Sequence, residues 1–312
     1  MGADQPDISV IVVNYRSADL TMRALEAARS SAGALLLEEI VVDNGSGTAD
    51  VEMLRCRLPQ ASVIALPENR GFAAGNNTGI AQARGRHLLL LNPDAFARED
   101  ALAQLARHLD AHPRAGLAAP VLENEDGSVQ ANLYGRFPSL TTLFVEFCFP
   151  LALVAVALRT RLTDPARAPG GWLPIAHAMG AALLVRADAA RATGPLDERF
   201  FLYLEETEWQ RRMACAGWRR DGVASARFIH LGGGSSSSPT LASPHYLDSA
   251  ALFFGHGRAA ERVITLAAAV SWVWLRLASA VGLSSGPEDE LRSAFRVLLR
   301  LLGARRRERR RS

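Results

Sequence analysis

ISVIVV at residues 8–13 is a run of β-branched apolar residues that contains one serine, at position 9. Such a run is typical of a strand buried on both faces of a parallel sheet. Outward from it, short buried runs alternate with stretches of helical length, which predicts a doubly wound, mostly parallel α/β sheet. The expected strands cover residues 8–13, 40–42, 62–66, 87–91, 117–122 and 180–186, and the expected helices cover residues 17–30, 48–57, 72–84, 99–111 and 205–216.

The positive charge of the chain is concentrated in one tail. Residues 305–311 (RRRERRR) have a net charge of +5, so the remaining residues have a net charge of −2 within the total of +3. A nucleic-acid-binding protein more often carries its charge on a folded face, interleaved with aromatic residues. We therefore expect no nucleic-acid partner.

The cysteines and the N-terminal residues indicate a cytoplasmic protein. Cys56, Cys148 and Cys215 are far apart and lack the spacing of metal ligands, so we expect buried, reduced thiols rather than a disulfide or a zinc site. The opening residues MGADQPD contain neither a basic segment nor an apolar run, so we expect no signal peptide.

Polar side chains follow three of the expected strands. Asn14 and Tyr15 follow the first strand, Asp43 and Asn44 follow the second, and Asn92-Pro93-Asp94 follows the fourth. Ligands of open parallel sheets bind outside the carboxyl ends of the strands. Turn residues and helix caps would account for any one of these clusters, but less well for all three. The pattern predicts a ligand site at this edge.

The residue types at this edge favour a nucleotide diphosphate and a divalent cation. A buried Asp43 suits hydrogen bonding to a base or ribose, and glycines 71, 75 and 79 suit close approach to phosphates near a helix start. Asp94 is a hard oxygen ligand for Mg²⁺ or Mn²⁺ shared with a diphosphate. The spacing of the glycines differs from the dinucleotide fingerprint and from the P-loop, which argues against a dehydrogenase.

Seven sequence blocks resemble glycosyltransferase family 2 and occur in that family's order, most like its bacterial rhamnosyltransferase branch. The resemblance covers roughly residues 8–235 and implies a GT-A fold. The blocks are VIVVNY (10–15), VVDNGS (41–46), PENRGFAAGNNTGI (67–80), LLLLNPDA (88–95), GAALLVR (180–186), LDERFFLYLEETEW (196–209) and IHLGGGSS (229–236).

The resemblance implies a nucleotide-sugar site with a metal. Tyr15 would lie beside the base, and Asp43 would bind the base or ribose. Asp94 would hold Mg²⁺ or Mn²⁺, while Asn92 stands where many members have an acid, which leaves one carboxylate in that block. The nucleotide-sugar-binding residues so implied are Tyr15, Asp43, Asn69, Gly71, Asn76 and Asn92.

The resemblance also implies an inverting mechanism in which a carboxylate deprotonates the acceptor hydroxyl. Glu206 occupies the position of the usual Asp base, with Glu205 as the alternative, and Glu208 stands for a second Asp. His230 would complete the metal site or serve as a structural histidine. Arg212 would orient the acids or contact substrate, and Trp172 would line the acceptor pocket or pack in the core.

The last part of the sequence predicts a helical extension over residues 236–312. Residues 263–283 are almost entirely apolar but contain Arg276, and residues 287–302 have an apolar face and an arginine face. We expect peripheral binding to an anionic membrane. A membrane span, packing on the domain and a homodimer contact are the alternatives.

Together these features predict an enzyme with a catalytic domain over residues 7–235. Residues 7–122 would form the nucleotide-sugar half, and residues 123–235 would form the acceptor and catalytic half. The donor would be a dTDP- or UDP-sugar, foremost dTDP-L-rhamnose, and the acceptor a lipid-linked saccharide or cell-surface glycan at the cytoplasmic face of the bacterial inner membrane. The alternative is a non-catalytic protein that binds nucleotide sugars or acts as a scaffold.

Overall fold

The computed structural model describes residues 5–130, 134–148, 170–232 and 244–255, with short pieces at 262–267, 269–270 and 273. The chain divides into two compact units. The first contains residues 1–137 and 163–235, and the second contains residues 138–162 and 236–312. Residues 138–162 therefore group with the C-terminal residues, although they lie inside the range expected for the catalytic domain.

Four parallel strands form one half of the main sheet in the first unit. β1 (Ile8–Asn14) lies between β2 (Leu37–Asn44) and β4 (His87–Leu91), and β3 (Ser62–Leu66) is on the outer side of β2. The register pairs Asn14 with Asp43 and Val12 with Leu91. The carboxyl ends of β1, β2 and β4 therefore meet at one edge, as the sequence predicts.

The other half of the sheet is mixed. β10 (Ala182–Arg186) runs antiparallel between β4 and β6 (Ala115–Glu123), and β11 (Arg219–His230) is parallel to β6. β5 (Ala95–Ala97) and β8 (Trp172–Pro174) pair antiparallel with β11. In the described part of the chain, nine strands form this sheet, in the order β3-β2-β1-β4-β10-β6-β11-β5 with β8 beside β11. A small second sheet joins β7 (Tyr134–Gly135) to β9 (His177–Ala178).

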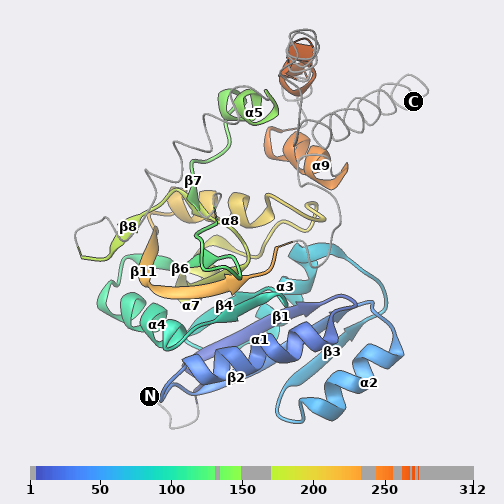
Figure 1. Cartoon of the computed structure of the whole chain (residues 1–312), viewed down its shortest axis with the longest axis vertical. Coiled ribbons are helices and arrows are strands. Elements are labelled where there is room, and N and C mark those ends of the chain that lie inside the picture. The colour runs from blue at the N-terminus through green and yellow to red at the C-terminus, as the bar shows by residue number, and fades with distance from the viewer. Residues whose placement is uncertain are drawn as a thin grey trace. The chain divides into compact units, whose positions relative to one another are not determined.

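Helices cover both faces of the main sheet, which is the predicted doubly wound architecture. α1 (Ala18–Ser31) packs against α2 (Thr48–Arg57) and α4 (Ala101–Ala111), and α1 crosses in front of the strands in Figure 1. A second group of helices is centred on α8 (Glu205–Cys215), which contacts both α3 (Gly71–Gln82) and α7 (Ala187–Thr193). The buried apolar residues of the strands form one core between these layers. Each fully buried Leu or Ile there contributes about 1.5–3 kcal/mol to folding.

Two of the α3 glycines have a packing role. A Cβ on Gly75 would lie 2.7 Å from a methyl of Val13, and a Cβ on Gly79 would lie 2.4 Å from a methyl of Ile11. Only glycine therefore lets α3 lie this close to β1. This packing accounts for Gly75 and Gly79, and the phosphate contact that their spacing indicated stays a prediction.

The predicted strands and helices are found, with boundaries that differ by a few residues, but the sequence does not predict β5, β7, β8, β9, β11 and α7 of the first unit. β11 is twelve residues long and contains register shifts near Val223 and Arg227. Its sequence, RRDGVASARFIH, mixes charged and small residues, so it lacks the continuous apolar run of the other central strands. Cys56 and Cys215 are exposed, which corrects the expectation that all three thiols are buried, whereas Cys148 is buried.

The described part of the second unit contains α5 (Leu140–Phe147) and α9 (Pro244–Phe253). α5 begins with a capping box formed by Ser139 and Thr142. Among the described residues, no helix combines the length and the apolar character needed to cross a bilayer. The amphipathic helix predicted at 287–302 and most of the apolar stretch at 263–283 lie outside the described residues.

Candidate functional site

The first two strand ends form a rigid polar pair at the predicted edge of the sheet. Asn14 donates a hydrogen bond from Nδ2 to Oδ1 of Asp43 at 2.7 Å, and the backbone N–H of Ser46 donates to Oδ2 at 3.0 Å. Thr21 fixes the Asn14 amide by donating to its Oδ1 at 2.9 Å. Both Asp43 oxygens keep a further lone pair, so this buried carboxylate can accept hydrogen bonds from a ligand.

Tyr15 continues this edge beyond β1. It is half-buried, and the guanidinium of Arg16 lies 5.1 Å from the centre of its ring. The backbone N–H of Arg16 donates to the Ser46 hydroxyl at 2.8 Å, which ties the residues after β1 to those after β2. An aromatic ring at this edge of the sheet suits stacking on a nucleotide base.

Asn69, Gly71 and Asn76 are engaged in contacts within the protein. Oδ1 of Asn69 accepts from the N–H of Gly71 at 2.9 Å and from the Asn44 side chain at 3.0 Å. Asn76 is buried and donates from its amide to the carbonyl of Phe72, one turn earlier in the same helix. Asn76 therefore has a partner inside α3, and its contact with the donor stays a prediction.

Asp94 and His230 are brought together from distant parts of the sequence. They lie at the start of β5 and the end of β11, where the N–H of Leu231 donates to the Asp94 carbonyl at 3.0 Å. Nε2 of His230 lies 3.5 Å from Oδ1 of Asp94, and both residues are buried.

Gln130 determines the tautomer of His230. Its amide nitrogen donates to the His230 carbonyl at 2.7 Å, so its amide oxygen is the atom that faces Nδ1 at 3.0 Å and must accept a hydrogen bond from it. In the neutral ring, Nε2 then carries a lone pair that faces the Asp94 carboxylate. Such a hydrogen-bonded second partner is typical of metal-binding histidines.

The Asp94 and His230 pair fits a divalent cation that is shared with a ligand. Adjacent ligands of an octahedral ion with bonds of about 2.1 Å lie roughly 3 Å apart, close to the observed separation. Among the described residues, no group of three or more His, Cys, Asp and Glu side chains could hold an ion alone. Asn92 adds no carboxylate, and its backbone N–H donates to the Ala181 carbonyl at 2.8 Å. The remaining ligands would therefore come from a diphosphate and water.

Glu205 and Glu206 begin α8 and lie close to the same edge. Gly180 borders Glu206, since a Cβ on this glycine would lie 3.2 Å from the Glu206 Cγ. The following residue, Ala181, is the one that accepts the Asn92 hydrogen bond at the end of β4. Glu206 therefore stands beside the segment that closes onto the fourth strand.

The two carboxyls differ in environment. Burial raises the pKa of Glu205 well above its ordinary value, and the adjacent Glu206 charge raises it further. Among the described residues, Oε2 of Glu205 has no hydrogen-bond partner. Burial also raises the pKa of Glu206, although the neighbouring Thr207 hydroxyl partly opposes this by hydrogen bonding to its carboxylate. Of the two, Glu206 is only half-buried, so it is the more accessible carboxyl.

Residues 9–190 match the sequence pattern of glycosyl transferase family 2. The chain belongs to this family.

The relatives of this glycosyltransferase include an N-acetylglucosaminyl-diphospho-decaprenol L-rhamnosyltransferase of Mycobacterium tuberculosis. The two are 28% identical over 239 residues, which are 72% of this chain and 75% of the relative. Among solved structures, it is similar to the mannosyltransferase PcManGT of Pyrobaculum calidifontis in complex with GDP-Man and Mn²⁺, with a TM-score of 0.60 and 15% identity over 97% of this chain and 87% of that one. It is also similar to GalNAc-T7 with UDP, GalNAc and Mn²⁺, with a TM-score of 0.55 and 16% identity over 79% of this chain and 48% of that one.

These likenesses confirm the predicted GT-A fold, and the family makes the protein a glycosyltransferase that uses a nucleotide sugar. The chain spans about half the length of GalNAc-T7. Membership of the family confirms the prediction of an enzyme over the alternative of a non-catalytic scaffold.

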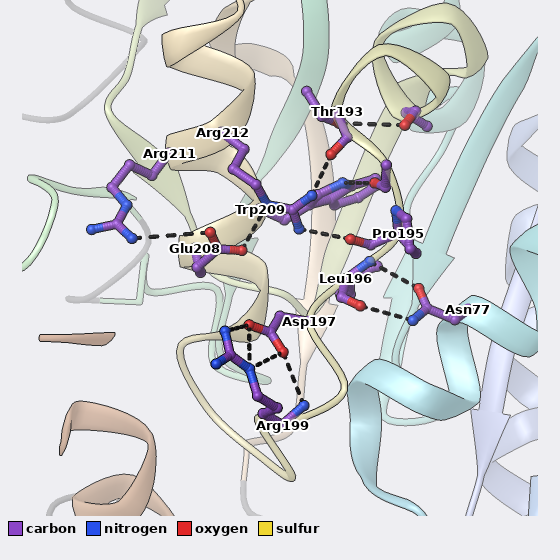
Figure 2. A network of polar contacts seen from close by, with 12 residues as sticks. Asn77, Thr193, Pro195, Leu196, Asp197, Arg199, Glu208, Trp209, Arg211 and Arg212 are labelled. Carbon is purple, nitrogen blue, oxygen red and sulfur yellow. Dashed lines mark hydrogen bonds and ion pairs between the residues drawn. The ribbon is translucent and has the colours of Figure 1, made fainter. Parts of the chain in front are cut away.

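A network of polar contacts holds α8 of the glycosyltransferase in place (Figure 2). Glu208 accepts a hydrogen bond from Arg212 at 2.8 Å, and Arg212 also donates to the carbonyls of Thr193 and Pro195. The buried Trp209 indole N–H donates to the Gly194 carbonyl at 2.8 Å. Arg212 and Glu208 therefore fix the helix on the loop that precedes it, which agrees with the salt-bridge alternative for Arg212.

Trp172 is not brought to the strand ends. It pairs with Val223, seven residues before His230 on β11, and its ring lies 4.8 Å from the ring of His112 and 4.6 Å from the Arg219 guanidinium. These ring contacts agree with the packing alternative, and a place for Trp172 in the acceptor pocket stays a prediction. Sequence reasoning missed Gln130 and Gly180. The start of the block GAALLVR was the available signal for Gly180, whereas nothing local marks Gln130.

The raised pKa of Glu205 predicts that replacing it stabilises the protein at neutral pH. The folded protein binds this proton more tightly than the unfolded chain, so the stability associated with Glu205 is present at low pH and is lost as the pH rises through the raised value. We expect Glu205→Gln to increase the free energy of unfolding at neutral pH by about 0.5–2 kcal/mol. The increase should vanish below the ordinary pKa of 4.5.

Denaturant unfolding at neutral pH and at a pH below 4.5 measures this effect. The control is Glu52→Gln, a change of an exposed residue on α2. A Glu205→Gln protein that is less stable than the wild type at neutral pH would contradict the prediction.

Proposed function

We propose that this glycosyltransferase moves L-rhamnose from dTDP-rhamnose to a lipid-linked saccharide or cell-surface glycan, with inversion at the anomeric carbon. The observation that carries the chemistry is an accessible carboxylate, Glu206, beside Gly180, whose neighbour Ala181 is bonded to Asn92 at the end of β4. The sugar is inferred from the Mycobacterium tuberculosis relative, whose name includes L-rhamnosyltransferase. A UDP-sugar is the alternative donor.

In this proposal the strand ends bind the donor. Asp43 accepts hydrogen bonds from the base or ribose with the lone pairs that Asn14 and Ser46 leave available, and Tyr15 lies along the base. Asp94 and the Nε2 atom of His230 would hold Mg²⁺ or Mn²⁺, with Gln130 fixing the tautomer. The cation would supply positive charge to the departing diphosphate.

Glu206 acts as the general base of the reaction. Its carboxylate removes the proton of the acceptor hydroxyl, whose oxygen forms a bond to the anomeric carbon as the bond to the diphosphate oxygen breaks. The electron pair of the broken bond leaves with the nucleoside diphosphate. Attack opposite to the leaving group inverts the anomeric configuration, and a positioned base contributes about 10²–10⁴-fold to the rate. The raised pKa makes Glu206 a stronger base than an exposed glutamate.

The base assignment predicts that Glu206→Gln abolishes transfer from dTDP-rhamnose while the donor still binds. The amide keeps the size of the side chain but cannot take a proton, so only transition-state stabilisation is lost. Product formation on a lipid-linked N-acetylglucosamine acceptor and the donor Kd measure the two effects, with Glu52→Gln as the control.

Full activity in Glu206→Gln together with inactivity in Glu205→Gln would move the base to Glu205. If both variants are active, the mechanism is wrong. If the wild type binds only UDP-sugars, the proposal of dTDP-rhamnose as the donor is wrong, but the assignment of Glu206 as the base is unaffected.

The metal assignment predicts that EDTA, Asp94→Ala and His230→Ala each remove the strengthening of dTDP binding by Mn²⁺. Each change removes the cation or one of its two proposed protein ligands. Titration of dTDP with and without Mn²⁺ measures this effect. His112→Ala is the control, because His112 packs against Trp172. Undiminished turnover in EDTA would mean that arginine side chains neutralise the diphosphate.

We further propose that the C-terminal residues bind the cytoplasmic face of the inner membrane, where a lipid-linked acceptor lies. In the described pieces of this segment, Leu266, Val270 and Val273 are exposed, and their spacing of four and three residues places them on one helical face. Residues 305–311 add six arginines. Each arginine near an anionic surface contributes about 1 kcal/mol to binding.

This membrane proposal predicts that deletion of residues 287–312 weakens binding to anionic vesicles. The deletion removes the arginine tail, so transfer to lipid-linked acceptors should fall more than transfer to water-soluble analogues. Flotation with phosphatidylglycerol vesicles at low salt measures binding, and neutral vesicles are the control. Wild-type protein that does not float with anionic vesicles would contradict the proposal.

A further inference from the structure

Asn44, the last residue of β2, uses its side chain to hold the turn at residues 69–71. It is 3% exposed and follows Asp43 directly. Its Nδ2 donates to Oδ1 of Asn69 and to the Gly71 carbonyl, both at 3.0 Å, and its Oδ1 accepts from the N–H of Arg70 at 3.0 Å. Three hydrogen bonds from one buried amide therefore attach this turn to the donor-binding strand.

This turn, residues 69–71, also fixes the loop that precedes α8. Gly71 has a φ of +86°, and a Cβ on it would lie 2.2 Å from the carbonyl oxygen of Phe201. The N–H of Phe72 donates to this same carbonyl at 2.8 Å. No other residue fits at position 71 without moving Phe201, so the contact fixes where the Phe201 backbone lies.

Two residues in the left-handed conformation connect Phe201 to the carboxylates. Tyr203 has a φ of 73° and Leu204 a φ of 68°, and α8 begins at the next residue, Glu205. A non-glycine residue in this region costs roughly 1–2 kcal/mol, so the conformation persists only where its surroundings enforce it. The other end of the loop is held by Asn77, which bonds to both the N–H and the carbonyl of Leu196. The start of α8 is thus fixed from α3.

We propose that Asn44 is a positioning residue for Glu206, acting through the turn 69–71 and the Phe201 carbonyl. The neighbouring residue, Asp43, binds the donor, so one strand end determines the place of both the donor and the base. The proposal rests on the assignment of Glu206 as the base. It predicts a loss of rate rather than a loss of donor affinity when Asn44 is changed.

The test is Asn44→Ala, assayed for kcat, donor KM, donor Kd and thermal midpoint. Misplacement of a catalytic group by 1 Å costs about 10²-fold, so we expect kcat to fall about 10- to 100-fold while the donor Kd changes less than about threefold. Ser9→Ala is the matched control, because it also removes hydrogen bonds of a buried side chain in the sheet. Ser9, on β1, donates to Glu38 and accepts from the N–H of Gly85. This variant should lower the thermal midpoint and keep kcat.

Gly71→Ala is a second, independent probe because its added methyl must displace Phe201. Its matched control is Gly127→Ala, at a similar φ of +81° with no atom within 4 Å of the new Cβ. We expect a fall in kcat for Gly71→Ala and an unchanged kcat for Gly127→Ala.

Two results together would overturn the positioning role and leave the base assignment intact. They are an unchanged kcat in the single variants Asn44→Ala and Gly71→Ala, and inactivity of the single variant Glu206→Gln. A weaker donor Kd with unchanged kcat would also overturn the positioning role. An active Glu206→Gln would instead refute the base on which the proposal rests.

Discussion

Parallel pairing of β1 with both β2 and β4 is the constraint on which the site depends. The register places Asn14 beside Asp43 and brings the end of β4 to the same edge. A shift of one residue would turn every side chain of a strand to the opposite face of the sheet. The apolar runs of all three strands are buried, so such a shift would expose the core and is strongly disfavoured. Hydrophobic burial therefore sets the geometry of the polar groups, which are themselves a small part of the folding energy.

The candidate site combines features that are unfavourable in isolation. A buried carboxyl beside a second carboxyl is costly, and consecutive left-handed residues precede them on the chain. The cost is offset by contacts that serve only to hold the surroundings, such as Arg212 on the carbonyls of Thr193 and Pro195 and Trp209 on Gly194 (Figure 2). The rigidity of this region is therefore concentrated around the groups assigned to proton transfer, as expected where placement matters more than stability.

The sequence predicted the parallel half of the fold well because its signals are local. Runs such as ISVIVV and HLLLL are buried on both faces, and the polar residues that follow them lie at one edge. The mixed half was less predictable, since β11 has no apolar run and owes its place to pairing with β6 and β8. Contacts such as Gln130 with His230 join residues one hundred positions apart, and no local pattern marks them. The glycines of α3 could be located but not interpreted, because packing against β1 and binding of phosphate require the same missing side chain.

The antiparallel direction of β10 gives the residues at this edge of the sheet two different positions relative to their strands. A parallel strand presents the residues that follow it at the carboxyl edge, whereas β10 presents those that precede it, Gly180 and Ala181. The proposed donor-binding residues thus follow β1, β2 and β4, whereas the residue that borders Glu206, Gly180, precedes β10. Insertions before Gly180 would leave the register of the four parallel strands unchanged, because these strands pair with one another. Such insertions would therefore change the surroundings of Glu206 without changing the pairing that places Asn14 beside Asp43.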